Sequence, residues 1–215
     1  MSQVVLDAVK ENKIVSIIRG VPADCILKTI QALYDGGIRC VEIAIDHTSA
    51  ETIANTLECI KRAAENYADK MYIGAGTVLT VEEVHQTSAA GARYMISPNV
   101  DEAVIKETKK LGLVSMPGAM TPSEIANAYT WGADIVKIFP AGDLGPKYFK
   151  SVRSPLGHIP LMAVGGVTVD NLADFLKVGA MGAGIGGNLA NVKLIKEGNF
   201  AAITETAQKF VAIVR

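Results

Sequence analysis

The sequence predicts one α/β domain, a closed (β/α)8 TIM barrel that spans residues 1–215. First, eight short apolar runs rich in β-branched residues alternate with helical segments along the whole chain. Second, this unit of strand, loop, helix and glycine recurs about every 20 to 30 residues, as βα units do. Third, glycine pairs follow the last two runs, where barrels often bind phosphate. An open doubly wound sheet is the competing architecture, and the glycine pairs favour the barrel.

The eight runs are nearly continuous in apolar character, which is typical of parallel strands covered on both faces. The N-terminal residues predict a helix, and a last helix is expected at about 199–214. We expect strands at residues 14–18, 40–45, 71–74, 93–96, 113–116, 134–139, 160–164 and 181–185.

Capping residues, prolines and glycines indicate the helix boundaries. A capping oxygen three residues before a glutamate predicts helix starts at Thr80, Asn99 and Thr121. Pro22 and Pro122 fit first-turn positions, where the missing N–H costs nothing. The glycines expected to end helices in the left-handed conformation are Gly36, Gly91, Gly112, Gly132 and Gly179.

Composition excludes several classes of partner. Hydrophobic residues make up 49% of the chain, charged residues 20%, and the net charge is -1. No basic surface is therefore expected for nucleic acid or an anionic membrane, and no apolar stretch reaches transmembrane length. The three cysteines form no C-x-x-C pair, and the first residues lack the basic region of a signal peptide. We expect a cytoplasmic protein.

Lys137 is the most informative residue, because it lies in the middle of the predicted buried strand at 134–139. A buried lysine costs free energy unless it is paired or functional. Alternation places Ile135, Lys137 and Phe139 on one face and only apolar residues on the other, so Lys137 is expected to point into the barrel. Desolvation there lowers the pKa of the ammonium and leaves a nucleophilic amine. A buried ion pair explains this strand equally well.

Glu42 favours the functional interpretation. In the strand at 40–45, alternation places Glu42 and Ala44 on the inward face. One inward amine and one inward carboxylate supply a nucleophile and a group that transfers protons. A structural salt bridge between Lys137 and Glu42 is the alternative.

The loops that follow the strands predict an anion site at the same end of the barrel. Arg19 comes directly after the first strand and is a natural anion ligand. The bare backbone of two glycine pairs could direct N–H groups at a phosphate or carboxylate. The loops concerned are Gly165-Gly166, Gly186-Gly187, Gly74-Ala75-Gly76-Thr77 and Ser97-Pro98-Asn99.

The three histidines do not cluster in the sequence. His85 and His158 are expected at the surface, whereas His47 follows Asp46 at the end of the second strand and could contact substrate or bind a metal. Because no H-x-H or H-E-x-x-H pattern is present, no metal site is predicted.

Six motifs, in this order, give the whole chain a family resemblance. They are VEI around Glu42, GAGTVL at 74–79, SPN at 97–99, VKIFP at 136–140, AVGGV at 163–167 and GIGG at 184–187. The chain resembles the class I 2-keto-3-deoxy-6-phosphogluconate (KDPG)/4-hydroxy-2-oxoglutarate (KHG) aldolases. The resemblance implies that Lys137 is the Schiff-base lysine, that Glu42 is the acid/base, that neither metal nor other cofactor is used, and that the protein is a homotrimer.

The resemblance also implies how a phosphorylated keto acid lies in the site. It places Thr77, Pro98 and Phe139 beside the pyruvoyl portion. It places the distal, phosphorylated end near Arg19, Gly165, Gly166, Gly187 and Asn188.

The chain departs from the family pattern in two places. Ala44 and Asp46-His47 stand where phosphogluconate-type members carry threonine and then an arginine that helps to hold the carboxylate. Asn188 stands where a serine is common. The departures leave the aldolase chemistry intact and the exact substrate open, including 2-keto-3-deoxy-6-phosphogalactonate (KDPGal).

The predicted reaction is reversible cleavage of a 2-keto-4-hydroxy acid, KDPG or 4-hydroxy-2-oxoglutarate, to pyruvate and either glyceraldehyde 3-phosphate or glyoxylate. One alternative is a phosphosugar epimerase or isomerase in which Glu42 transfers protons. Another is a barrel that binds a phosphorylated ligand without catalysis, with Lys137 and Glu42 as an internal ion pair. Only the aldolase needs an imine on Lys137.

Overall fold

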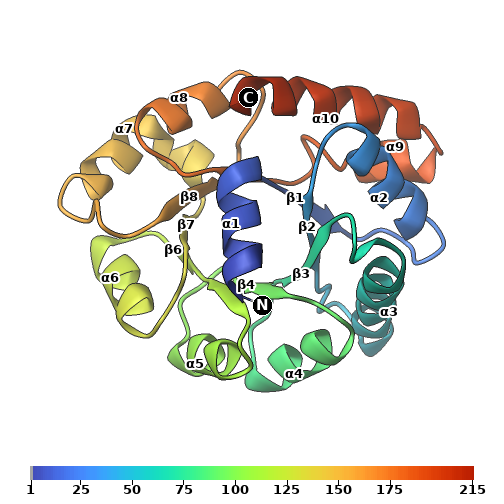
Figure 1. Ribbon diagram of the computed structural model, residues 1–215, viewed down its shortest axis with the longest axis horizontal. Coiled ribbons are helices and arrows are strands. Elements are labelled where there is room, and N and C mark those ends of the chain that lie inside the picture. Colours follow the sequence, from blue (N-terminus) through green and yellow to red (C-terminus); the bar gives the residue numbers. More distant parts are fainter. Residues whose placement is uncertain (1) are drawn as a thin grey trace.

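A computed structural model of the chain describes residues 2–215 and shows a parallel barrel ringed by helices (Figure 1). The strands are β1 (Ile14–Arg19), β2 (Cys40–Ala44), β3 (Tyr72–Gly76), β4 (Tyr94–Ile96), β5 (Val114–Met116), β6 (Gly118–Ala119), β7 (Val136–Ile138), β8 (Leu161–Val164) and β9 (Ala183–Ile185). The helices are α1 (Ser2–Asn12), α2 (Ile26–Asp35), α3 (Ala50–Tyr67), α4 (Val81–Ala89), α5 (Glu102–Lys110), α6 (Pro122–Thr130), α7 (Ala141–Arg153), α8 (Leu172–Lys177), α9 (Val192–Lys196) and α10 (Phe200–Val214). The predicted fold class is confirmed.

The two edge strands of the sheet belong to one continuous segment of chain, and this segment closes the barrel. The strand order is β5-β4-β3-β2-β1-β9-β8-β7-β6, so the edge strands β5 and β6 are neighbours in sequence, separated by Pro117. Proline has no N–H to donate to a ladder, and its carbonyl accepts from Lys137 N at 2.9 Å. The fifth predicted strand thus continues beyond Pro117, with Gly118 in register with Lys137.

Several helix boundaries differ from the prediction. The predicted cap at Asn99 is wrong: α5 begins two residues later, where the Asp101 side chain accepts from Val104 N at 2.9 Å. Pro22 lies in the loop before α2 and not in its first turn. The capping boxes at Thr80 and Thr121 are confirmed, with Pro122 at the start of α6.

The glycine that ends α2 in the left-handed conformation is Gly37, with φ 94°, and the prediction of Gly36 is wrong. Gly36 has φ -75°, and a Cβ there would lie 2.3 Å from Ala207 Cβ. Position 36 therefore needs a glycine because α10 packs against it. The other predicted stops have the expected positive φ: Gly91, Gly112, Gly132 and Gly179.

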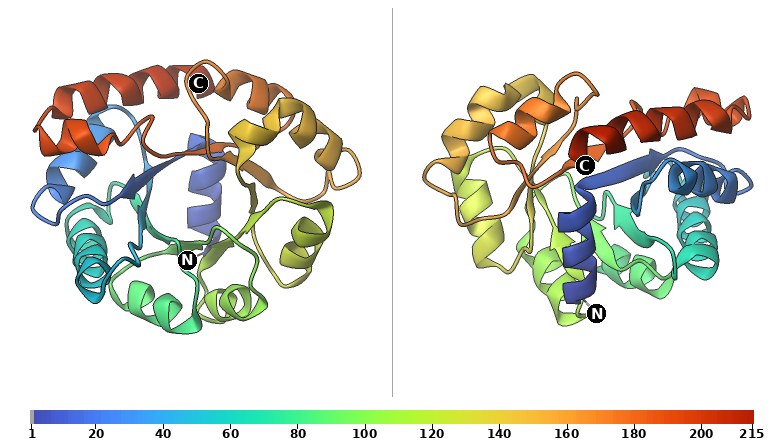
Figure 2. Two further views of the ribbon diagram at one scale, coloured as in Figure 1. Left: turned by 180° about the vertical axis from the view of Figure 1, so that it is seen from behind. Right: turned by 45° about the horizontal axis from the view of Figure 1, so that its top comes forward.

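Helix α1 covers the N-terminal end of the barrel, as Figures 1 and 2 show from opposite sides. Its buried residues Val5, Ala8 and Val9 form one apolar cluster with side chains inside the barrel, among them Tyr94 and Met116. This cluster fills the half of the barrel interior next to α1, at the N-terminal ends of the strands, which we call the lower half. Space for a ligand is therefore expected at the other end, where the strands finish.

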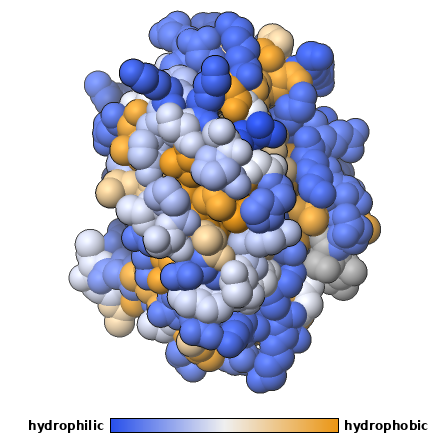
Figure 3. All heavy atoms as spheres, turned by 90° about the vertical axis from the view of Figure 1, so that its left-hand side faces the viewer, coloured by the Kyte–Doolittle hydropathy of each residue, from blue (hydrophilic) through white to orange (hydrophobic). Residues whose placement is uncertain are grey.

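One face of the molecule carries a local group of apolar side chains. On the side that carries α6 and α7, apolar and weakly polar groups occupy the middle of the surface and hydrophilic ones surround them (Figure 3). Met120, just before α6, is 46% exposed, and Tyr129 of α6 is 41% exposed.

No helix within residues 2–215 is long and apolar enough to cross a membrane.

Candidate active site

A cavity of ≈ 450 Å³ opens at the C-terminal ends of the strands. Every residue predicted for the site lies along its wall. They are Arg19, Glu42, Thr77, Pro98, Lys137, Phe139, Gly165, Gly166, Gly187 and Asn188. Ile17, Val164 and Gly184 complete the inner wall, and sequence analysis did not single them out.

Lys137 and Glu42 lie deep in this cavity. Lys137 is 6% exposed and Glu42 is 2% exposed. Lys137 Nζ lies 5.3 Å from the centroid of the Phe139 ring. The Glu42 Oε2 atom is buried and accepts no hydrogen bond from any group of the described chain. It is therefore an acceptor available to a ligand in the cavity.

Burial has opposite effects on the two pKa values. Desolvation lowers the pKa of Lys137, while attraction by Glu42 opposes this and repulsion by Arg19 adds to it. Desolvation raises the pKa of Glu42, and the charges of Lys137 and Arg19 act against it. Both shifts are toward the neutral forms, so the site holds an amine that loses its proton more readily, and a carboxyl that keeps its proton more readily, than the free side chains do.

Two glycines make room for these side chains, one on the strand next to Glu42 and one on the strand next to Lys137. A Cβ at Gly76 of β3 would lie 1.7 Å from Glu42 Oε1. A Cβ at Gly118 of β6 would lie 2.7 Å from Lys137 Cε and 2.6 Å from the Pro98 carbonyl oxygen. Sequence analysis missed this role, because it depends on the register between neighbouring strands.

Arg19 and Thr77 form a polar pair at the rim. Arg19, predicted to follow the first strand, is the last residue of β1, and its Nη2 donates to Thr77 Oγ1 at 2.7 Å. Because that oxygen accepts from Arg19, the Thr77 hydroxyl proton is free to donate elsewhere. The pair connects the residue expected at the phosphate with the residue expected at the pyruvoyl portion.

The two glycine corners are joined by side-chain amides. Gly165 and Gly166 have φ 85° and 71°, and their carbonyl oxygens accept from Gly142 N at 2.7 Å and Asn171 Nδ2 at 3.0 Å. Asn188 Nδ2 donates to the Val167 carbonyl at 2.9 Å and thereby connects the corner after β9 to the corner after β8. The chain thus fixes two backbone turns against each other at one side of the cavity.

The histidines lie outside this cavity. His47 Nε2 contacts Glu83 Oε1 at 2.7 Å, and His85 Nε2 contacts Glu107 Oε1 at 3.2 Å. His158 packs edge-on against the Tyr129 ring. Across residues 2–215, no group of three His, Cys, Asp or Glu side chains is arranged to hold a metal ion.

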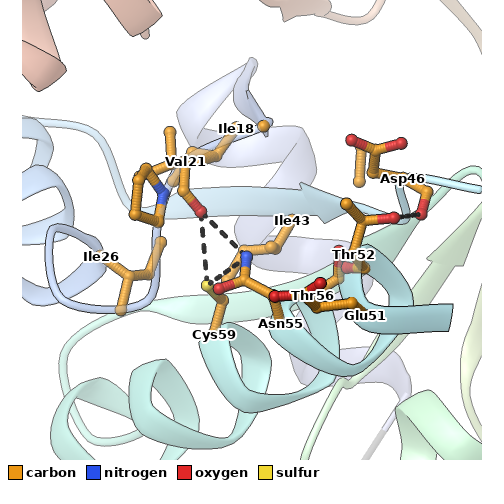
Figure 4. A pocket seen from close by; sticks show the side chains of 13 residues that line it. Ile18, Val21, Ile26, Ile43, Asp46, Glu51, Thr52, Asn55, Thr56 and Cys59 are labelled. Atoms are coloured by element: carbon orange, nitrogen blue, oxygen red, sulfur yellow. Dashed lines mark hydrogen bonds between the residues drawn. The ribbon is translucent and has the colours of Figure 1, made fainter. Parts of the chain in front are cut away.

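A second cavity, of ≈ 260 Å³, lies beside the outer faces of β1 and β2 next to α3 (Figure 4). Its floor is formed by Ile18, Ile43 and Cys59, and Asn55 Nδ2 donates to the Val21 carbonyl at 3.2 Å. The described residues that line it include no lysine, arginine or histidine. Lys137 and Glu42 both lie in the barrel cavity, which is therefore the candidate active site.

Comparison with known proteins agrees with this assignment of a barrel enzyme. Residues 5–206 match the family model described as KDPG and KHG aldolase. The 2-dehydro-3-deoxy-6-phosphogalactonate aldolase of Escherichia coli (strain K12) is 34% identical over 94% of this chain and 93% of its own length. A solved structure described as native KDPGal is 33% identical, with a TM-score of 0.83 over 93% of each chain.

A third similar protein shows the same fold at lower identity. It is the KDPG aldolase from Legionella pneumophila, solved with pyruvate captured at low pH as a covalent carbinolamine intermediate. It is 24% identical, with a TM-score of 0.86 over 95% of this chain and 97% of its own.

The chain belongs to the KDPG and KHG aldolase family. It is a class I aldolase and hence a lyase. The family assignment supports the aldolase interpretation over an epimerase, an isomerase and a non-catalytic binding barrel.

Gly76→Ala tests the space that Glu42 needs. Because the new Cβ would overlap the carboxylate, we expect Glu42 to be displaced and turnover to fall about 10²-fold, the scale of lost acid–base catalysis. Gly157→Ala is the control, since this exposed glycine has a Cβ position 3.3 Å from its nearest neighbour. Steady-state kinetics measures the effect. Equal activity in the two variants would show that Glu42 does not need the glycine.

Lys137→Met tests the electrostatics of the pair. Without the lysine, the raised pKa of Glu42 rises further, so the folded state keeps a proton that the unfolded chain releases above its ordinary value of 4.5. Stability should therefore be highest in acid and fall as pH rises above about 4.5, by at most about 1.4 kcal/mol per pH unit. The wild type keeps a smaller fall from Glu42, and the lowered pKa of Lys137 adds a rise that ends at the ordinary lysine value of 10.5.

Urea unfolding at a series of pH values measures this dependence. The double variant Lys137→Met/Glu42→Gln is the control and should lose the fall, because it has no titrating group at either position. A single variant as independent of pH as the double variant would contradict the coupling.

Proposed function

We propose that Lys137 forms a Schiff base with the C2 ketone of a 2-keto-3-deoxy-6-phospho sugar acid, and that the preferred substrate is the galactonate. The products are pyruvate and glyceraldehyde 3-phosphate. The observation that carries this proposal is the position of Lys137, a buried lysine of lowered pKa beside Glu42 in one cavity.

The cleavage follows from the properties of an imine. The neutral Lys137 amine adds to the C2 carbonyl, and loss of water together with uptake of one proton, which the Glu42 carboxyl can supply, leaves a protonated imine and a Glu42 carboxylate. Glu42 removes the proton of the C4 hydroxyl, the C3–C4 bond breaks, and its electron pair moves to the imine nitrogen to give an enamine. The aldehyde then leaves. A proton returned to C3 and hydrolysis of the imine release pyruvate and restore Lys137.

Glu42 is suited to both proton transfers. Burial raises its pKa above the ordinary value, which makes the carboxylate a stronger base and lets the carboxyl hold a proton that it can return. Its Oε2 atom has no acceptor role in the described chain, so a substrate hydroxyl or a water can occupy it. The protonated imine is itself the electron sink, so this mechanism requires no metal or organic cofactor.

The two ends of the substrate carry negative charges, and the cavity offers a partner for each. We assign the carboxylate to the Thr77 hydroxyl, with Pro98 and Phe139 beside the pyruvoyl carbons. We assign the phosphate to the glycine corners and Arg19. With the carbonyls of Gly165 and Gly166 engaged, the N–H groups of that turn are available to an anion. Gly187 and Asn188 complete this end.

We choose the galactonate over its gluconate epimer as the preferred substrate because of the names that the similar proteins carry. The Escherichia coli protein at 34% identity and a solved structure at 33% identity carry the phosphogalactonate name. The replacement of the family's carboxylate-binding arginine by the Asp46-His47 segment also separates this chain from the phosphogluconate type.

A reducing, cytoplasmic setting is part of the proposal. It is supported by Cys25, Cys40 and Cys59, which are all free thiols, two of them buried.

We also propose assembly into a homotrimer. The apolar surface on the side of α6 and α7, with Met120 and Tyr129 exposed, supports burial against another copy (Figure 3). Light scattering of the purified protein should give three times the mass of the 22.7 kDa chain. The single-chain mass at all concentrations would contradict this.

Borohydride reduction in the presence of pyruvate tests the Schiff base. We expect one reduced pyruvyl group per chain, located on Lys137 by peptide mapping, because its lowered pKa gives it a larger neutral fraction than an exposed lysine has. Lys110, with a side chain 73% exposed, is the internal control and should stay unlabelled. Lys137→Met should abolish labelling. Cleavage of a keto acid without a label on Lys137 would overturn the mechanism.

The same preparation distinguishes the substrates. Pyruvate release from KDPGal, KDPG and 4-hydroxy-2-oxoglutarate gives kcat/KM for each. KDPGal is expected to have the highest value. A preference for KDPG together with labelling of Lys137 would overturn the choice of epimer and leave the mechanism in place.

A further inference from the structure

The Asp46-His47 segment lies directly after β2, the strand that carries Glu42, yet His47 is not among the residues that line the catalytic cavity. Sequence analysis identified this segment as a departure from the family, and the proposed reaction gives it no role. Its contacts connect two of the loops at the rim of the barrel.

His47 contacts a carboxylate that organises the loop after β3. Its Nε2 lies 2.7 Å from Glu83 Oε1, and the other oxygen of Glu83 accepts from Leu79 N at 2.6 Å and Thr80 N at 3.1 Å. The Glu83 side chain is 12% exposed and that of His47 is 33% exposed. A single carboxylate therefore ties the loop after β2 to the first turn of α4.

The His47 end of this contact is anchored. Asp46 Oδ1 accepts from Thr48 N at 3.0 Å and Thr48 Oγ1 at 2.7 Å, which closes a tight turn around His47. Thr52 Oγ1 of α3 donates to the Asp46 carbonyl at 2.8 Å, as the dashed line in Figure 4 shows. His47 is thus held by a helix on one side while it contacts Glu83 on the other.

Glu83 binds the N–H of Leu79, two residues after Thr77, and the backbone conformation of Thr77 must be held in place by its surroundings. Thr77 has φ 56°, a left-handed conformation that a β-branched residue rarely adopts. Such a conformation persists only where the surroundings hold it. Three contacts do so: Arg19 on its hydroxyl, Val78 N donating to the Ile96 carbonyl at 3.1 Å, and Glu83 on the N–H of Leu79.

We propose that His47 is a positioning residue for Thr77, acting through Glu83 and the Leu79 N–H. It fixes the loop in which the Thr77 hydroxyl is aimed at the substrate carboxylate. In this chain the Asp46-His47 segment thereby supports carboxylate binding indirectly, with no cationic side chain on the carboxylate itself. The inference rests on the proposed function, because it takes the pyruvoyl carboxylate as the partner of Thr77.

Loss of the His47–Glu83 contact should affect binding more than chemistry. Thr77 would spend part of its time in other conformations, which weakens a hydrogen bond to a charged group by about 10-fold. Lys137 lies on β7, and Glu42 is held within β2 by its pairing with β1 and β3, so both keep their places. A rise in KM with little change in kcat is the kinetic sign of lost ground-state binding.

A pair of amide substitutions tests the contact. His47→Gln keeps an N–H donor at about the reach of the imidazole Nε2, whereas His47→Asn is one methylene shorter and loses Glu83. The measurement is exchange of pyruvate methyl protons with deuterated solvent, followed by NMR at a series of pyruvate concentrations. We expect KM for pyruvate to rise about 10-fold in His47→Asn, to stay near the wild-type value in His47→Gln, and kcat to change less than about 3-fold in both.

His85→Ala is the matched control, because His85 of α4 also pairs with a glutamate, Glu107 of α5, and makes none of the contacts that hold the Thr77 loop. It should leave KM unchanged even if its Tm falls as much as that of His47→Asn. Equal KM values in His47→Asn and the wild type would overturn the proposal, as would equal rises in His47→Asn and His47→Gln. Absence of exchange and of borohydride labelling in the wild type would instead overturn the proposed function.

Discussion

Two ionisable side chains inside a closed barrel place the strongest constraint on this structure. The interior of an eight-stranded barrel is just wide enough to be filled by its own side chains, so a lysine and a glutamate there compete with packing. Burial also removes the water that stabilises their charges. Room for the two side chains is left by Gly76 and Gly118, which have none of their own. The mutual attraction of Lys137 and Glu42 opposes the loss of hydration.

The distribution of bulk inside the barrel follows from this constraint. In the lower half, Tyr94 fills the space left at Gly74, where a Cβ would lie 2.1 Å from its ring, and its hydroxyl donates to the Val41 carbonyl at 2.5 Å. Helix α1 closes that end. In the upper half the neighbouring glycine, Gly76, accommodates the Glu42 carboxylate. Two glycines separated by one residue on β3 therefore serve opposite purposes: one allows dense packing, the other a reactive group.

Alternation along the strands was enough to predict the centre of the site. A strand has a side-chain period of two, so the direction of Lys137 and Glu42 could be inferred from their neighbours without knowing the barrel's dimensions. Residues that follow strands converge at one end of any parallel barrel, and this explains why Arg19, Thr77 and Asn188 could be expected near one another. The register beyond local alternation could not be predicted, and neither could the closure across Pro117.

The errors share a physical origin, because each depends on packing between distant segments. Gly36 looks like a helix stop in sequence, but its small size is required by α10, some 170 residues away. Asn99 and Asp101 are both suitable caps, and the choice depends on where α5 packs against β5. The contact between His47 and Glu83 spans 36 residues and carries no motif. Local rules identify which groups a segment can offer, whereas tertiary contacts decide which one is used.

The electrostatics of the pair suit the order of events in the proposed mechanism. Before substrate binds, desolvation favours a neutral Lys137, as nucleophilic addition requires. Formation of the protonated imine then places a positive charge on that nitrogen. An opposite charge beside a carboxyl lowers its pKa, so Glu42 becomes a carboxylate at the step in which it must accept the C4 hydroxyl proton. When the C3–C4 bond breaks, the imine charge is neutralised, the pKa of Glu42 rises again, and the group is ready to return a proton to C3. One buried pair can thus alternate between base and acid because the reaction itself switches the neighbouring charge.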